Sequence, residues 1–139
     1  MTPHDFVHVS TIRTTPEALW HALIDPEFTR QYWGRRIASD WRVGAAVTHH
    51  LDDGTTETGT VLEWDPPRRM AYSFAHDDAD LKGTRVTMVL EPTGEAVKLT
   101  VLHEGLTAAA KRAVSAGWPG VLASLKTLLE AGLPARRTP

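Results

Sequence analysis

The chain has 139 residues, a formal net charge of −2 with neutral histidines, and no cysteine. The missing cysteine excludes disulfides, thiolate metal sites and a cysteine nucleophile, and the scattered basic residues argue against a nucleic-acid partner. A hydrophobic content of 42% suits one folded domain, which we expect over residues 1–134, with a frayed tail at 135–139. No apolar run approaches about 18 residues and no signal peptide is recognisable, so we expect a cytoplasmic protein without membrane insertion.

The first quarter of the chain predicts one strand followed by two short helices. Residues 5–13 alternate in polarity and are rich in β-branched side chains, which favours a strand. Residues 15–17 and 25–27 each supply an N-cap residue, a proline at the first helical position and an early acid. Gly34 is expected to end the second of these helices.

The middle of the chain predicts an antiparallel sheet. From residue 45 onward apolar residues recur at every second position, which is typical of strands with one buried face. Segments rich in proline, glycine and aspartate separate these strands, and such short connections join antiparallel neighbours. The expected strands are 45–51, 57–64, 70–75, 85–90 and 97–103.

The last part predicts one long amphipathic helix over residues 107–131, because its large apolar residues recur at steps of three and four. Thr107 is the expected N-cap and Gly132 the expected stop, while Pro119 predicts a kink or a helix restart. The fold class is therefore α+β, with about six or seven curved strands around this helix. One helix is too narrow to fill such a curved sheet, so we expect a cavity or groove between them.

Several segments resemble one family over nearly the whole chain. They are residues 15–20 with 25–26, 32–34, 59–63 with 65–72, 103–106 and 117–118. This pattern is similar to the helix-grip fold of the START-like (SRPBCC) superfamily, which includes polyketide cyclases and the birch-pollen allergen. Within it, the chain resembles the branch named after the activator of the heat-shock-protein ATPase. The resemblance implies a helix-grip fold and either an apolar ligand in its cavity or a stress-related, co-chaperone-like role.

The inward-facing side chains give the candidate ligand site. Most ligand pockets are apolar with a few polar groups, which here would be two histidines and one tyrosine. Ordinary core packing is the alternative explanation for most of these positions. The expected ligand-binding residues are Tyr32, Trp33, His49, Leu51, Tyr72, Phe74, Met88, Leu90, Val101, His103, Trp118 and Leu122.

The sequence contains no catalytic motif, and we expect no catalytic residue, metal or cofactor. Adjacent residues on a strand point to opposite faces, so His49 and His50 do not share a metal ion. His103 is expected to anchor a loop by hydrogen bonds rather than to catalyse. The acids that general acid–base chemistry would need are expected at turns or on the outer face: Glu57, Glu63, Glu91 and Glu95.

Three functions stay open at this point. The first is non-catalytic binding of an apolar small molecule of lipid-like, aromatic or polyketide-like character. The second is a protein-interaction or co-chaperone-like module with a chaperone partner, which predicts an exposed apolar patch around Trp33 and Trp41. The third is a cyclase or hydrolase that uses a histidine or tyrosine of the cavity. Self-association into a homodimer is left open.

Overall fold

The computed structural model describes residues 5–74 and 83–131. The predicted tail at 135–139 and the helix stop at Gly132 lie outside these residues. The elements are β1 (Phe6–Ile12), α1 (Pro16–Ile24), α2 (Pro26–Trp33), β2 (Arg35–Ser39), β3 (Ala46–Leu51), β4 (Thr56–Asp65), β5 (Arg69–Ser73), β6 (Arg85–Thr93), β7 (Ala96–Glu104) and α3 (Ala108–Glu130).

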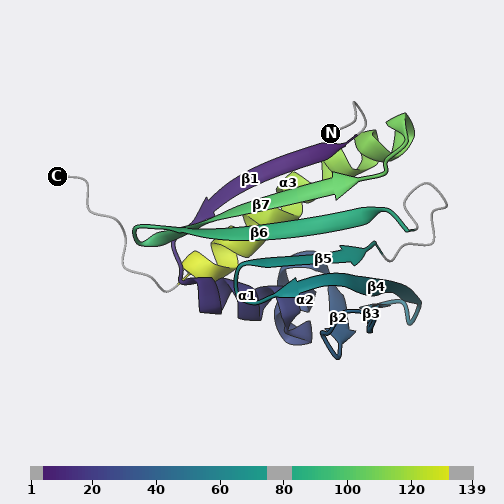
Figure 1. Cartoon of the computed structure of the whole chain (residues 1–139), viewed down its shortest axis with the longest axis horizontal. Coiled ribbons are helices and arrows are strands. Elements are labelled where there is room, and N and C mark those ends of the chain that lie inside the picture. The colour runs from purple at the N-terminus through teal and green to yellow at the C-terminus, as the bar shows by residue number, and fades with distance from the viewer. Residues whose placement is uncertain (1–4, 75–82, 132–139) are drawn as a thin grey trace.

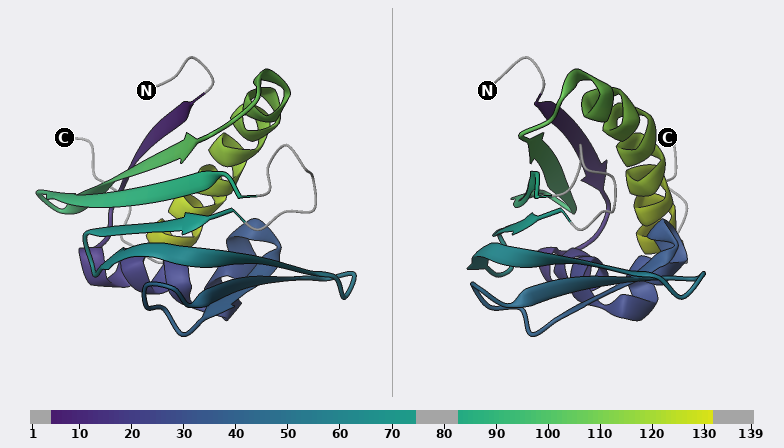
Figure 2. Two further views of the ribbon diagram at one scale, coloured as in Figure 1. Left: turned by 45° about the vertical axis from the view of Figure 1, so that its right-hand side comes forward. Right: turned by 90° about the vertical axis from the view of Figure 1, so that its right-hand side faces the viewer.

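The strands form one antiparallel sheet of seven strands in the order β1-β7-β6-β5-β4-β3-β2. From β2 to β7 each strand pairs with the next one in the chain, and β1 joins the far edge beside β7. The sheet curls, and Figure 2 shows α3 crossing its concave side while α1 and α2 lie at one end. This arrangement, seen face-on in Figure 1, is the helix-grip α+β fold that was predicted.

The long helix α3 buries one face against the sheet. Its buried side chains recur at steps of three and four: Ala110, Val114, Trp118, Leu122 and Leu125. The predicted N-cap is confirmed, because Thr107 Oγ1 accepts a hydrogen bond of 3.1 Å from the Ala110 backbone. The helix continues through Pro119, so the restart expected there does not occur. No helix among the described segments, α3 included, has the length and apolar character needed to cross a membrane.

Two proline-led helices place α2 beside α3. Thr15 and Asp25 are the N-caps, and Asp25 Oδ1 accepts a hydrogen bond of 2.9 Å from the Glu27 backbone. Gly34 ends α2 in the left-handed conformation, with φ of 77°. The helix packs against both β2 and α3. Its last residue, Trp33, therefore lies next to the long helix.

One strand, β2, was not among those expected from the sequence. Within its five residues only Ile37 is fully buried, so the segment carries no two-residue apolar repeat that would reveal a strand. Tertiary pairing forms it instead, since β2 runs antiparallel to β3 with Arg35 opposite Leu51. This pairing fixes the position of Arg35, which becomes important below.

Candidate functional site

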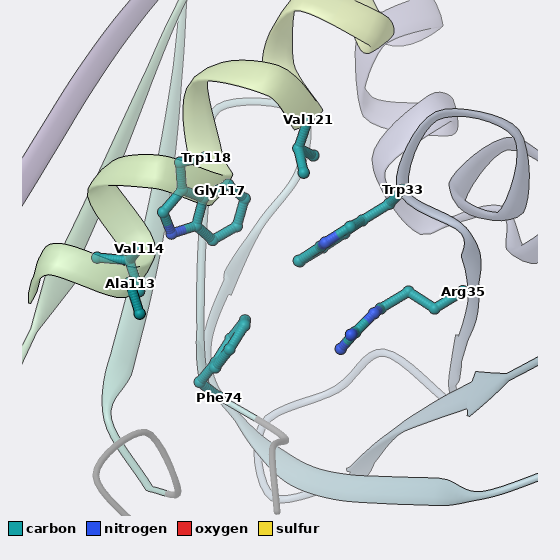
Figure 3. A pocket seen from close by; sticks show the side chains of 8 residues that line it. All are labelled: Trp33, Arg35, Phe74, Ala113, Val114, Gly117, Trp118 and Val121. Atoms are coloured by element: carbon teal, nitrogen blue, oxygen red, sulfur yellow. The ribbon is translucent and has the colours of Figure 1, made fainter. Parts of the chain in front are cut away.

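A pocket of about 210 Å³ lies between α3, the C-terminal end of α2 and the adjoining ends of β2 and β5 (Figure 3). It opens to solvent on one side. Among the described residues that line it, Arg35 alone carries a charge. The lining residues are Trp33, Arg35, Phe74, Ala113, Val114, Gly117, Trp118 and Val121.

Three aromatic rings from three separate elements form its walls. The ring centroid of Trp33 lies 5.0 Å from that of Trp118 and 6.2 Å from that of Phe74. The Phe74 and Trp118 centroids are also 6.2 Å apart. The Trp118 ring is tilted against the other two, while the Trp33 and Phe74 rings are closer to parallel, and aromatic side chains favour both arrangements. On α3, residues spaced by three and four share a face, which brings Val114 and Val121 to the same side as Trp118.

Arg35 supplies the polar edge of the pocket. Its guanidinium carbon lies 5.5 Å from the Trp33 ring centroid, a cation–π contact. Its Nη1 donates to His49 Nδ1 at 3.1 Å and to Glu57 Oε1 at 3.3 Å. Because Arg35 always donates, Nδ1 of His49 accepts, and the neutral imidazole carries its proton on Nε2. The arginine thus fixes the tautomer of a fully buried histidine.

The placement of Glu57 corrects an expectation. It was expected at a turn or on the outer face, but only 5% of its side chain is exposed. Glu57 lies directly opposite His49 in the β3–β4 pairing and shares its inward face. A buried carboxylate needs a charged or hydrogen-bonding partner, and the guanidinium of Arg35 provides one. A strand that the sequence did not reveal therefore explains how this acid is buried.

His103 lies behind the aromatic wall and orients it. Its Nδ1 accepts from the Trp118 indole at 3.1 Å, and its Nε2 is 2.7 Å from Thr84 Oγ1. With Nδ1 accepting, the neutral ring carries its proton on Nε2 and donates it to Thr84. Burial lowers the pKa of His103 from 6.5 to about 4, so the ring is neutral near pH 7. The hydrogen bonding expected of His103 is present, but one partner lies on the helix α3 and the other just before β6, whereas a loop anchor was expected.

His49 and His50 point to opposite faces, as predicted, since His49 is fully buried and His50 is exposed. Within the described residues, no group of three or more histidine, aspartate or glutamate side chains is arranged to hold a metal ion. Burial raises the pKa of Tyr72 above its ordinary value, so this phenol stays protonated at physiological pH.

The twelve expected ligand-binding residues separate into three groups. Trp33, Phe74 and Trp118 line the pocket. His49 and His103 contact those rings from behind, with centroid distances of 5.6 Å to Trp33 and 4.9 Å to Phe74, respectively. The others are not among the residues that line this pocket, and all of them are buried except the half-buried Leu51: Tyr32, Leu51, Tyr72, Met88, Leu90, Val101 and Leu122. Tyr32, for example, donates its hydroxyl to the Ala22 carbonyl at 3.1 Å.

Five lining residues were missing from the expected site. Four of them lie on α3, and two of these, Val114 and Val121, share the helix face of Trp118 and belong to the apolar repeat that predicted the helix. Helical spacing thus carried a usable signal for that wall. For Arg35 no such signal exists in the sequence, because β2 could not be recognised as a strand. The five residues are Arg35, Ala113, Val114, Gly117 and Val121.

Comparison with known proteins places this architecture in a family. The family model described as Activator of Hsp90 ATPase homolog 1-like protein matches residues 13–130. No curated protein matches the chain. Among solved structures, protein MLL2253 from Mesorhizobium loti is 26% identical, with a TM-score of 0.75 over 92% of this chain and 98% of that one.

Two further structures share the fold. The Aha1 dimer from Colwellia psychrerythraea is 19% identical, with a TM-score of 0.76 over 94% of this chain and 98% of that one. CalU16 from Micromonospora echinospora is 21% identical, with a TM-score of 0.76 over 94% of this chain and 76% of that one. The family match covers most of the residues that form the sheet, the short helices and α3. The chain therefore belongs to the Activator of Hsp90 ATPase homolog 1-like family.

Proposed function

We propose that this protein binds a small apolar molecule, without catalysis, in the pocket between Trp33, Phe74 and Trp118. The observation that supports this function is the convergence of three aromatic side chains, from three elements, on one accessible pocket. Concave sites with apolar walls and a single polar group are typical of small-molecule binding. The protein's role would then be to hold or carry the molecule.

The volume of the pocket limits the size of the ligand that it can enclose. A volume of about 210 Å³ is smaller than the ~300–1,000 Å³ of sites for drug-sized molecules. At ~30 Å³ per water it holds about seven waters, which is the room one aromatic ring with a small substituent needs. A lipid-like or polyketide-like molecule would extend through the open side into solvent. We therefore favour the aromatic class among the three initially expected.

The expected affinity is modest. A single ring that buries about 150 Å² of apolar surface gains about 4 kcal/mol at ~25 cal/mol per Å². That free energy corresponds to a dissociation constant near 1 mM. Titrations should therefore extend to millimolar concentrations of a probe such as indole.

Filling the pocket from α3 tests the proposal. A Cβ added at Gly117 meets no atom within 4 Å, so Gly117→Leu places a side chain in free space at the pocket wall. We expect indole binding to weaken at least tenfold. The measurement is the shift of the Trp33 and Trp118 indole N–H resonances in a heteronuclear NMR titration.

Gly120→Leu is the matched control. Gly120 lies on the same helix, also has open space around its Cβ position, and is not among the pocket residues. This variant should bind indole as the original chain does. Equal indole affinity in both variants would show that the ligand does not occupy this pocket.

A protein-interaction role is the second candidate, favoured by the family and by the dimeric Aha1 from Colwellia psychrerythraea. The exposed patch was expected around Trp33 and Trp41, which lie beyond opposite ends of β2, a strand whose five residues span about 16 Å at ~3.3 Å per residue. Both side chains are partly buried against the core. Trp41 stacks on Trp64 at a centroid distance of 5.3 Å. Sedimentation velocity decides whether the chain dimerises: a single monomeric species at high concentration would contradict self-association and leave binding to a different protein as the only form of this candidate.

The cyclase or hydrolase alternative has less support. Both ring nitrogens of His103 lie in hydrogen bonds, and its lowered pKa makes the ring a weak base near neutral pH.

A further inference from the structure

We infer that the pocket selects a small aromatic carboxylate, whose charged group pairs with Arg35. This inference rests on the proposed function, since it names the chemical class of the molecule that the pocket would hold. It adds a specificity-determining residue to a site otherwise described by its apolar walls.

The first argument is the set of donors that Arg35 leaves unused. Only Nη1 takes part in its hydrogen bonds to His49 and Glu57, while Nε and Nη2 have no partner among residues 5–74 and 83–131. These two nitrogens form one edge of the guanidinium, with two parallel N–H groups. That edge matches the two oxygens of a carboxylate in a bidentate pair.

The second argument is the direction of the side chain. Arg35 is largely buried, with 17% of its side chain exposed, yet it lines the pocket. Figure 3 shows the guanidinium and the Trp33 ring pointing together into the space that faces Trp118 and Phe74. An aromatic ring against those walls places a carboxylate substituent at the unused edge of Arg35.

The third argument concerns charge. Arg35 is the only charged residue among the described residues that line the pocket, so it is the group there that can pair with a ligand of opposite charge. A neutral ligand leaves two partly desolvated donors without an acceptor, which is costly. Glu57 opposes an incoming anion, but from behind Nη1. A carboxylate at about 3 Å from the guanidinium and about 6 Å from Glu57 is attracted roughly twice as strongly as it is repelled.

The pairing with Glu57 also makes the inference testable, because Glu57 weakens the attraction without touching the pocket. Glu57→Gln keeps the size of the side chain and removes its negative charge. It should raise affinity for an anionic aromatic and leave affinity for a neutral one unchanged. The double variant Arg35→Met/Glu57→Gln removes both charges together and avoids a buried carboxylate without its partner.

The experiment titrates benzoate and its neutral isostere benzamide into the full chain and both variants, followed by the Trp33 and Trp118 indole N–H resonances. We expect the original chain to prefer benzoate about tenfold, and Glu57→Gln to widen that preference severalfold. The double variant should lose the preference. Added salt should weaken benzoate binding and leave benzamide binding unchanged.

The outcomes separate the inference from the proposed function. If benzamide binds as tightly as benzoate to the original chain, the pocket binds aromatics but the carboxylate inference is wrong. If neither probe nor indole shifts the two resonances at millimolar concentration, the proposed function fails as well. Because the comparison in the original chain is decisive, a variant that does not fold leaves the test intact.

Discussion

Replacing Gly59 by alanine is expected to lower the free energy of unfolding by about 3 kcal/mol or more. A Cβ at this position would lie 2.0 Å from the backbone oxygen of Ser73, far inside van der Waals contact. Gly59 sits in β4 shortly before the bulge between Val61 and Glu63, where the strand bends and β5 crosses close by. The neighbouring atom belongs to the backbone of a paired strand, so it does not move aside as a flexible side chain would. Overpacking in rigid surroundings typically costs 1–3 kcal/mol, and the very short approach places Gly59→Ala at or above the upper end.

Urea unfolding followed by tryptophan fluorescence measures this change. Thr58→Ala is the matched control, because the neighbouring side chain is exposed and its truncation should change stability by less than about 0.5 kcal/mol. Equal midpoints for the two variants would mean that β4 and β5 separate easily at this point. The close approach also explains why Ser73 Oγ accepts a hydrogen bond of 2.8 Å from the Thr60 backbone.

The second large effect is a loss of stability in mild acid caused by His103. Burial lowers its pKa from the ordinary 6.5 to about 4, so between these values the unfolded chain binds a proton that the folded chain excludes. The contribution of the neutral His103 ring to the free energy of unfolding is fully present above about pH 6.5, and it decreases as the pH falls toward 4. Each pKa unit corresponds to about 1.4 kcal/mol, so the full loss is about 3–4 kcal/mol, of which about 3 kcal/mol has occurred at pH 4.

Unfolding free energies measured in urea from pH 7.5 to 4 test this effect against a His103→Gln variant. The glutamine cannot titrate. The difference in free energy of unfolding between the original chain and the variant should therefore shrink by about 3 kcal/mol as the pH is lowered from 7.5 to 4. Parallel curves would contradict a role for His103 in the acid response. Because His103 holds the Trp118 indole, protonation should also loosen one wall of the pocket.

Much of this fold was determined locally. The proline-led caps at Thr15 and Asp25, the two-residue repeat of the strands and the helical spacing of residues 107–131 each act within a few positions. Such signals identify elements because capping and the burial of one face depend on neighbours in the chain. They also gave the α+β class and placed Trp33, Phe74 and Trp118 on inward faces.

Only the tertiary structure decided which inward residues form a site. The apolar repeat separates inside from outside, but it does not tell a packed residue such as Met88 from a pocket wall such as Phe74. That difference depends on the distance between α3 and the sheet, and this distance results from the combined packing of all the side chains between them. Arg35 and Glu57 show the same limit: pairing across β2, β3 and β4 brings the two charges together, so that each permits the burial of the other. Neither is explained by its sequence neighbours, because the interaction that stabilises them joins residues far apart in the chain.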